Sequence, residues 1–551
     1  MTPARRRLLV DVVVVLGAIA LGLALTAGGV ATWDSYAHYE RSRWLVHTLG
    51  LPSTRTANGL DETMKWYGPL WALGLGLVSE TALRFVHDPD WVQHAFNFAL
   101  FPVGLYAVAR LLVRAGARPS TAALAVALLV GAIRLGGHAL LNVNDFPMAM
   151  LSLLVMLYLW VRLRELDAAA RAAGGLPLRT LAALGIVATV PFLVRPPVAL
   201  QLCTLVGFLA LYAATALRGA RRARRVALCA WPLAAGVVFA VALWPALWER
   251  GRALPLRRGL LEFTHFHWVG TVRFFGRDAM SNALPRSYPL LWLPVMLTPA
   301  AFVLLLAGLG RAALRPRAAT SAARSFVLPR PGGGTIDVSL CRWLALHAAL
   351  LWLGVLLLHP TVYDEERHLL FLYPPLLVLA ALGLDDLSER VKVALAVLVA
   401  AGALVSYAQW GRYAYVYESP LVGGRTVGAH RFMGDYWGAC VPLAVDALAG
   451  RVPPGADVAV PGPLDPALVQ YARRRAGPLA RPGFGPYRIM LAPVRWPAYV
   501  ILSNRNGRND PGLRAVADGR LRELWRADMP PGDPACVLVE YDGLGGRAAA
   551  R

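Results

Sequence analysis

An aspartate stands shortly after the first long apolar stretch of the sequence. This stretch, residues 8–30, is long enough to cross a bilayer at about 20 residues, and Asp34 follows it. A triple arginine at residues 5–7 precedes it, so positive-inside retention predicts a cytoplasmic N-terminus and places Asp34 at the outer membrane surface. A carboxylate there can accept a proton from a substrate held at the lipid boundary. The plainer alternative is a polar residue that ends a helix.

Further polar and ionisable side chains fall at the outer ends of later apolar stretches. Such groups are costly near the membrane and therefore suggest function. Arginines can hold a phosphate by charge-assisted hydrogen bonds, and carboxylates can deprotonate an acceptor. The outer residues of these types are His38, His138, Asn144, Asp145, Arg195, His265, His267 and the run from Asp364 through Arg367 to His368.

The composition is that of a polytopic membrane protein, because 57% of the 551 residues are hydrophobic and only 16% are charged. The net charge is +23, but the basic runs lie between apolar stretches, where cytoplasmic retention explains them better than nucleic-acid binding. The sequence has no Gly-rich phosphate loop and no dinucleotide fingerprint. Outer-face chemistry without a bound nucleotide requires an activated substrate in the membrane, and a lipid-linked phosphate sugar fits.

The alternation of apolar stretches and basic loops predicts a mainly α-helical protein with about eleven transmembrane helices. The interrupted segment 70–86 is interpreted as an outer juxtamembrane or re-entrant helix, since a crossing there would move the following arginines outside. Residues 248–288 form a second outer loop, and residues 311–342 form a basic, partly disordered inner loop. The predicted spans are 8–30, 92–109, 121–135, 148–161, 181–194, 198–217, 226–247, 290–309, 343–358, 369–384 and 393–408.

The sequence divides into a membrane domain, residues 1–410, and a small outer α/β domain, residues 411–551. In the second part, strands are predicted at 456–460, 498–502 and 536–541, and helices at 464–474 and 512–525. Cys440 and Cys536 would be the two cysteines on the oxidising side of the membrane. A disulfide between them and two unpaired thiols are equal alternatives at this point.

Three motifs resemble the GT-C membrane glycosyltransferases, in the family 39-like branch that contains protein O-mannosyltransferases and lipid A aminoarabinose transferases. The first is an acidic residue after the first span, in Trp33-Asp-Ser-Tyr-Ala-His38. The second is Leu284-Pro-Arg-Ser-Tyr-Pro-Leu-Leu-Trp-Leu-Pro294, which runs into Leu297-Thr-Pro299. The third is Glu366-Arg-His-Leu-Leu-Phe-Leu-Tyr-Pro-Pro375. Asn142-Val-Asn-Asp-Phe-Pro147 and Gly434-Asp-Tyr-Trp-Gly438 are similar to segments of bacterial members.

The resemblance implies an inverting transfer of a hexosyl or pentosyl group from a polyprenyl-phosphate donor, on the outer face of a bacterial inner membrane. Asp34 would be the general base. Arg367, His368 and Arg195 would hold the donor phosphate; for Arg195 the alternative is a charge at the membrane surface. His38, His138, Asn144 and Tyr288 would line the substrate site. The acceptor would be a lipid, glycan or protein, as in protein glycosylation or cell-envelope glycan synthesis.

Several assignments keep an alternative. Many members carry Asp-Glu in the first loop, whereas Ser35 follows Asp34 here, so Asp145 is the candidate for any second acidic role, unless it is a helix cap before Pro147. His265 and His267 line a sugar site or belong to an interfacial amphipathic segment. A divalent metal on Asp34, His38 and Asp145 is conceivable, but no ligand spacing supports it. A flippase for lipid-linked sugars and a non-catalytic scaffold are the rival functions.

Overall fold

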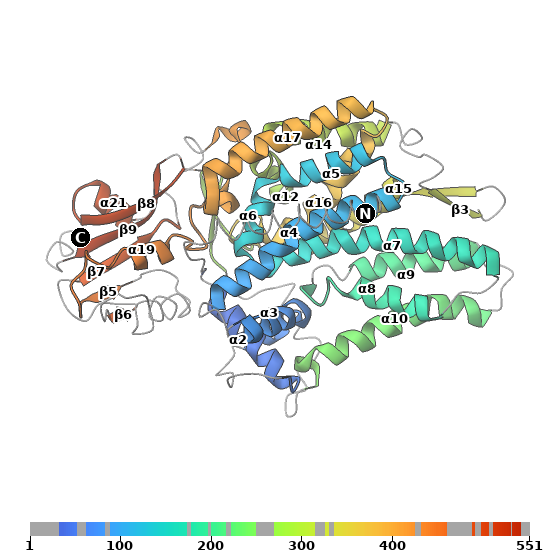
Figure 1. Ribbon diagram of the computed structural model, residues 1–551, viewed down its shortest axis with the longest axis horizontal. Helices are drawn as coiled ribbons and strands as arrows, with labels where there is room; N and C mark the ends of the chain where they lie inside the picture. The colour runs from blue at the N-terminus through green and yellow to red at the C-terminus, as the bar shows by residue number, and fades with distance from the viewer. Residues whose placement is uncertain are drawn as a thin grey trace, which may run out of the picture.

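A helical body and a small C-terminal sheet make up the computed structural model (Figure 1). The structure describes residues 32, 34–51, 62–82, 89–173, 178–196, 200–215, 222–248, 269–314, 325–329, 335–424, 431–459, 488–490, 498–505, 511–530 and 532–541. The first predicted span, the predicted helix 464–474, His265 and His267 lie outside these residues.

Five described helices are long and apolar enough to cross a membrane, which is the composition of a multi-pass membrane protein. Five further apolar helices of the body are shorter. The long helices are α4 (Pro89–Arg114), α7 (Asp145–Ala173), α10 (Arg222–Leu243), α15 (Leu340–Leu358) and α17 (Glu389–Trp410). The shorter ones are α5 (Pro119–Val130), α8 (Leu178–Thr189), α9 (Leu200–Thr215), α14 (Pro299–Leu314) and α16 (Tyr373–Gly383), which continues η5 (Arg367–Leu372).

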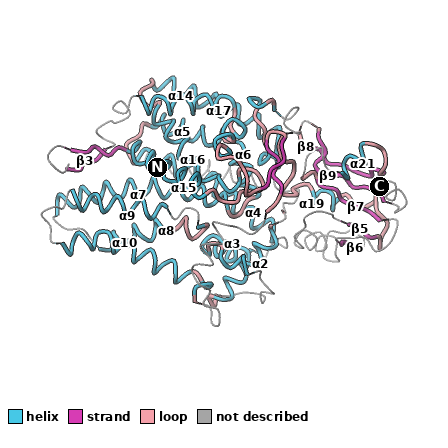
Figure 2. The backbone as a smooth tube through the Cα atoms, turned by 180° about the vertical axis from the view of Figure 1, so that it is seen from behind, coloured by secondary structure: helices cyan, strands magenta, loops and turns pink. Residues whose placement is uncertain are grey.

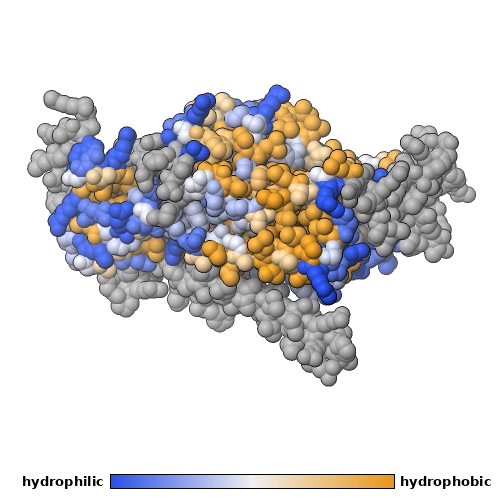
Figure 3. All heavy atoms as spheres, turned by 90° about the horizontal axis from the view of Figure 1, so that it is seen from above, coloured by the Kyte–Doolittle hydropathy of each residue, from blue (hydrophilic) through white to orange (hydrophobic). Residues whose placement is uncertain are grey.

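The surface of the body agrees with a position in lipid. Large apolar side chains are exposed along α10, α14, α15 and α17, where soluble helices would carry polar ones. Figure 3 shows hydrophobic residues spread over the middle of the helical body, whereas hydrophilic residues are frequent on the C-terminal domain. Close helix packing inside the body uses small residues. A Cβ on Gly308 of α14 would lie 2.2 Å from the Ala380 carbonyl oxygen of α16.

A short helical layer follows the first predicted span. It contains α2 (Ser35–Thr48), η1 (Glu62–Trp66) and α3 (Pro69–Ala82). The described part of α3 is 14 residues long and corresponds to most of the segment 70–86, which is predicted to be a juxtamembrane or re-entrant helix. In Figure 1, α2 and α3 lie together at one end of the body, away from α14 and α17.

Several predicted boundaries are wrong, and proline or a local turn explains most of them. The span predicted at 121–135 breaks after α5, and α6 (Ile133–Leu141) continues beyond its predicted end. The span predicted at 290–309 starts only at α14, because prolines divide residues 288–298 into α12 (Tyr288–Leu291), α13 (Leu293–Met296) and an extended turn. The predicted inner loop 311–342 contains the antiparallel strands β3 (Ser325–Pro329) and β4 (Thr335–Ser339).

An outer hairpin lies in the second predicted outer loop. Its strands β1 (Thr271–Phe274) and β2 (Arg277–Met280) pair antiparallel around a turn at Phe275 and Gly276. Both turn residues have positive φ, 48° at Phe275 and 80° at Gly276. The Phe275 ring contacts Phe432 at 5.1 Å between centroids, and the Gly276 N–H donates to the Arg431 carbonyl at 2.9 Å.

The C-terminal domain is built on a five-stranded mixed sheet of order β6-β5-β7-β9-β8. The strands β5 (Asp457–Ala459), β6 (Arg488–Met490) and β7 (Ala498–Ser503) run parallel, and β8 (Arg522–Met529) and β9 (Asp533–Tyr541) complete the sheet antiparallel. The helices α19 (Val441–Asp446) and α21 (Pro511–Ala517) lie beside it. The predicted helix 512–525 is wrong in its second half, because the chain turns at Gly519, with φ of 69°, and continues as β8.

The domain touches the helical body at the end where α2, α6 and the start of α4 gather, as both views of the backbone show (Figures 1 and 2). The 3-10 helix η6 (Gly411–Val416) follows α17 and packs against α6. The segment 431–440 then leads from the body into the sheet.

Candidate active site

Asp34 is the N-cap residue of α2, yet its side chain makes no capping hydrogen bond. Its Oδ2 instead accepts from Nη1 of Arg367 at 3.2 Å. The second terminal nitrogen of Arg367 lies 3.0 Å from Oδ2 of Asp364. The Asp34 side chain is 33% exposed, whereas the Arg367 side chain is 6% exposed. The buried guanidinium therefore holds one side of the carboxylate, and the other side is accessible. This is the arrangement that a general base at a membrane surface requires.

The run from Asp364 to Arg367 turns sharply before η5. Asp364 and Glu365 both have positive φ, 52° and 63°, which is uncommon for residues with a Cβ and marks a turn maintained by its contacts. The turn points Asp364 and Arg367 toward Asp34. It points Glu365 and Glu366 into the body, where both pair with the buried Arg134 of α6.

Arg134, Glu365 and Glu366 form a fully buried ionic cluster, the anchor, which holds the turn in place. The Arg134 Nη1 contacts Glu365 and lies 2.8 Å from Oε2 of Glu366, and the guanidinium stacks over Trp292 at 4.6 Å. Burial and the neighbouring carboxylate outweigh Arg134 and raise the pKa of Glu365 to about 8. Burial also disfavours the charged form of Glu366, but Arg134 and His138 together lower its pKa. One negative charge of the pair therefore resides mainly on Glu366.

Arg195 pairs with Asp145 at the outer end of α7. The Asp145 Oδ2 also accepts from Nδ2 of Asn142 at 3.0 Å, and that amide lies 3.3 Å from Nδ1 of His138. On its other side, His138 Nε2 lies 3.6 Å from Oε1 of Glu366. Asp145 and His138 are thus almost completely buried in a network that joins Arg195 to the anchor.

Arg41 has a different environment from the other arginines of the site. Its side chain is buried, and its hydrogen-bond partners are neutral: the Gly68 carbonyl at 3.0 Å and the Asn144 Oδ1 at 3.4 Å. Within the described residues, no carboxylate pairs with it, and its Nε has no hydrogen-bond partner. Burial, to which Arg195 adds, lowers the pKa of Arg41 to about 10. Arg41 thus contributes a buried positive charge that no described carboxylate neutralises.

Aromatic side chains cover these guanidinium groups. Arg41 and Arg195 each lie 5.5 Å from the centroid of the Tyr67 ring. Arg367 lies 4.8 Å from the Tyr363 ring and 4.6 Å from Trp437. Such cation–π contacts orient a guanidinium without neutralising its charge.

His38 belongs to the same cluster as a neutral group. Its Nε2 lies 3.1 Å from Nδ2 of Asn144. Burial, and then the cations Arg41, Arg367 and Arg195, hold the pKa of His38 well below 6.5. His38 therefore stays uncharged beside these guanidinium groups.

The structure brings most of the predicted site residues together, with two departures. Asp34, His38, Asn144, Asp145, Arg195 and Arg367 form one cluster, and His368 is next to it, its ring 4.4 Å from Tyr363. Tyr288 instead lies in an aromatic group with Phe274 and Trp292. His138 is enclosed rather than lining an open site.

The sequence reasoning missed Arg41 and Arg134 and gave Asp364 no role of its own. In the sequence, Arg41 and Arg134 resemble ordinary basic residues near membrane spans. The spacing of Asp364 within the Asp-Glu-Glu-Arg run was the available signal.

A predominantly apolar cavity of about 480 Å³ opens among α8, α9 and α10. Its lining includes Phe192, three positions before Arg195 in the sequence, together with Leu202, Val206, Val237 and Ala240. This lining suits a hydrocarbon chain.

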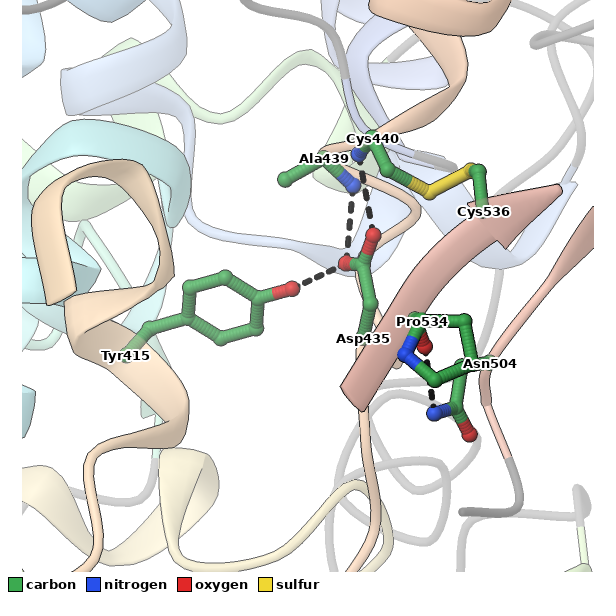
Figure 4. Close-up of a disulfide and its surroundings, with 7 residues drawn as sticks. All are labelled: Tyr415, Asp435, Ala439, Cys440, Asn504, Pro534 and Cys536. Carbon is green, nitrogen blue, oxygen red and sulfur yellow. Dashed lines mark hydrogen bonds between the residues drawn. A yellow bond between two sulfur atoms is a disulfide. The ribbon is translucent and has the colours of Figure 1, made fainter. Parts of the chain in front are cut away.

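The pairing of Cys440 with Cys536 is confirmed, because the two sulfur atoms are bonded and join the segment after the body to β9 (Figure 4). Beside the disulfide, Asp435 accepts from the backbone N–H groups of Ala439 and Cys440 at 2.8 and 2.9 Å and from the Tyr415 hydroxyl. Asp435 and the two cysteines also form a His/Cys/Asp/Glu group compact enough for a metal, but the bonded sulfurs are not available as thiolate ligands.

The chain was compared with known proteins. No family model and no curated protein sequence matches it. The apo structure of ArnT from Cupriavidus metallidurans matches with a TM-score of 0.50 at 14% identity over 98% of each chain. The same ArnT bound to undecaprenyl phosphate matches with a TM-score of 0.48 at 15% identity, over 98% of this chain and 99% of that one. An apo oligosaccharyltransferase from Archaeoglobus fulgidus matches with a TM-score of 0.41 at 12% identity, over 89% of this chain and 70% of the other.

The match to apo ArnT extends over the helical body and the C-terminal domain alike, since it covers nearly the whole of both chains. At this level of identity it establishes a common fold. The chain therefore has the fold of the GT-C membrane glycosyltransferases, as its motifs predict.

Proposed function

We propose that this chain is an inverting membrane glycosyltransferase, which moves a sugar from a polyprenyl-phosphate donor to an acceptor at the outer membrane surface. The observation that carries the proposal is the pairing of an open carboxylate, Asp34, with a cluster of guanidinium groups, one of which has no described counter-ion. A base and an anion site side by side are the two elements that such a transfer needs.

Asp34 would remove the proton from an acceptor hydroxyl. The acceptor oxygen then forms a bond to the anomeric carbon, while the bond from that carbon to the phosphate oxygen breaks with its electron pair on phosphate. Phosphate leaves readily without protonation, so one base suffices, in contrast to the two carboxylates of typical glycoside hydrolases. Asp145, which is buried against Arg195, would orient that arginine rather than act as a second base.

Arg41, Arg195 and Arg367 would bind the donor phosphate, with His368 beside them. Arg195 lies against Asp145 and Arg367 against Asp34 and Asp364, whereas the charge of Arg41 is uncompensated within the described residues. A phosphate would supply the missing negative charge and the missing acceptor. The neutral state of His38 and the Tyr67 ring between two guanidinium groups keep this region positive.

The donor's hydrocarbon chain would lie in the cavity among α8, α9 and α10. The lining of that cavity is almost entirely apolar and includes Phe192, which is three residues before Arg195 in the sequence. ArnT from Cupriavidus metallidurans, whose apo form has this fold, has been crystallised with undecaprenyl phosphate, a lipid of the proposed class.

The test is the Asp34→Asn variant of the purified protein. We expect normal insertion and near-normal binding of undecaprenyl phosphate. Release of undecaprenyl phosphate from a panel of its hexose and pentose conjugates, with a membrane extract as acceptor source, should fall roughly 10²–10⁴-fold, the usual worth of general-base catalysis.

Asp278→Asn on the hairpin of β1 and β2 is the matched control, because it removes an exposed carboxylate that pairs with Arg273, and neither residue belongs to the cluster. It should transfer like the wild type. Wild-type transfer by Asp34→Asn itself would refute the assignment. A flippase or a scaffold would give no transfer by any form of the protein.

A further inference from the structure

We propose that Arg505 of the C-terminal domain is a positioning residue of the active site, so that the domain forms part of the catalytic unit. The inference rests on the proposed function. It concerns a residue 141 positions from its partner Asp364, in a part of the chain to which no role is assigned above.

The contacts form a chain of alternating charges. Nη2 of Arg505 donates to Oδ1 of Asp364 at 2.6 Å. The other carboxylate oxygen of Asp364 lies 3.0 Å from Nη2 of Arg367, and Nη1 of Arg367 donates to Asp34 at 3.2 Å. Both oxygens of Asp364 are thus occupied, one by an arginine of each domain. This series of charge contacts ends at Asp34, the proposed base.

Burial makes this chain effective. The side chains of Arg505, Asp364 and Arg367 are 15%, 9% and 6% exposed, so water screens their charges poorly. Arg505 neutralises Asp364 and thereby leaves Arg367 free to hold Asp34. Without Arg505, Asp364 would draw the guanidinium of Arg367 to itself and away from the base.

The position of Arg505 is set by the sheet. Asn504, at the end of β7, donates its N–H to the Ala535 carbonyl at 2.8 Å and its side-chain amide to the Pro534 carbonyl at 2.6 Å (Figure 4). These contacts lie next to Cys536, whose disulfide joins β9 to the segment leaving the body.

The segment that leaves the body also holds Arg505. The Gly434 N–H donates to the Arg505 carbonyl at 3.1 Å, and Nη1 of Arg505 donates to the Tyr436 carbonyl at 3.2 Å. A Cβ at Gly434 would lie 2.2 Å from the Asn504 carbonyl oxygen, so only glycine permits this approach. The guanidinium therefore reaches Asp364 from a backbone that is held on two sides.

The experiment compares Arg505→Gln with Arg505→Lys, Asp364→Asn and the double variant, in the full-length purified protein. The assay is release of undecaprenyl phosphate from its sugar conjugates. We expect Arg505→Gln to lower kcat roughly 10- to 100-fold, the scale for a misplaced catalytic group, and to raise the KM for donor, because Arg367 also binds the phosphate. Lysine should restore part of kcat, because it returns the charge without the planar fork.

The double variant separates positioning from a general structural effect. If Arg505 acts through Asp364, Arg505→Gln should cost little once Asp364 is Asn, so the two losses are not additive. Arg520→Gln is the control, since Arg520 is an exposed arginine of the same domain that pairs with Asp518. It should retain wild-type kcat.

Three results would overturn the inference: wild-type kcat in Arg505→Gln, losses that multiply in the double variant, or a loss of kcat that follows the unfolded fraction. If Arg505→Gln does not fold, Arg505→Lys carries the test, and a wild-type kcat with a wild-type KM for donor in that variant would overturn the inference as well. An inactive Asp34→Asn beside a fully active Arg505→Gln would reject this inference alone, whereas an active Asp34→Asn would reject the proposed function.

Discussion

Replacing Arg41 should weaken phosphate binding but not stability, whereas replacing Arg43 should lower stability but not binding. Both are buried arginines of α2, two residues apart. Arg43 lies 3.1 Å from Glu40 and 3.8 Å from Glu80, whereas Arg41 has neutral hydrogen-bond partners. The changes are Arg41→Gln and Arg43→Gln, which remove one charge from the same helix in different surroundings.

The magnitude of the binding effect follows from the missing counter-ion. A hydrogen bond to a charged group contributes about 1.5–3 kcal/mol, and each 1.4 kcal/mol is a factor of ten. Arg41→Gln should therefore weaken binding of undecaprenyl phosphate by roughly 10- to 150-fold. Arg43→Gln should leave this affinity unchanged, because its charge is already neutralised.

The effect on stability should be reversed. Glutamine at position 41 removes a buried charge that lacks a described carboxylate, so the unfolding temperature should stay the same or rise. Glutamine at position 43 leaves Glu40 and Glu80 without that cation, at a cost on the order of 3–5 kcal/mol. The assays are titration with undecaprenyl phosphate and thermal unfolding, both in one detergent. Unchanged affinity in Arg41→Gln, or a larger loss of stability there than in Arg43→Gln, would refute the reasoning.

Three further predictions use buried groups. Glu366→Gln should lower thermal stability more than Glu365→Gln, because Glu366 carries most of the charge that faces Arg134; the reverse order in thermal unfolding would contradict this assignment. The double substitution Cys440→Ser/Cys536→Ser should destabilise the C-terminal domain by up to about 4–5 kcal/mol, since the disulfide closes a loop with a sequence separation of 96. Limited proteolysis of the wild type with and without reductant tests the same loss of stability. Equal protection of the domain in both conditions would contradict the prediction. Folding lowers the pKa of His38, so below pH 6.5 the unfolded chain takes up a proton that the folded chain does not. This contribution to stability is therefore lost as the pH falls from 6.5 through the folded pKa. The free energy of unfolding should change by at most about 1.4 kcal/mol per pH unit for this reason, and by less in His38→Asn.

Local hydropathy patterns predicted several of the helices and strands. The apolar stretches 343–358 and 393–408 correspond to α15 and α17, and the strands at 498–502 and 536–541 correspond to β7 and β9. The division of residues 288–298 was missed because hydropathy alone does not register proline. The second half of the predicted helix 512–525 was wrong because the glycine turn at Gly519 was overlooked.

The site was predicted in its types of residue but not in its pairing. Asp34 and Arg367 were selected by their motifs, and they are in contact. Nothing in the sequence near Arg41 shows that no described carboxylate pairs with it, because that depends on which of the distant carboxylates pair with Arg195, Arg367 and Arg505. Pairing across the fold is a property of the tertiary structure.

The outer hairpin has a consequence for the order of folding. A two-residue hairpin turn normally uses glycine or asparagine at both positions, and Phe275 at φ of 48° opposes the turn locally. The turn is held instead by the Phe432 ring and the Arg431 carbonyl, which belong to a segment far downstream. The turn between β1 and β2 therefore gains these stabilising contacts only when the chain beyond α17 has been made. During synthesis, this turn can form its contacts only after Arg431 and Phe432 have been added to the chain.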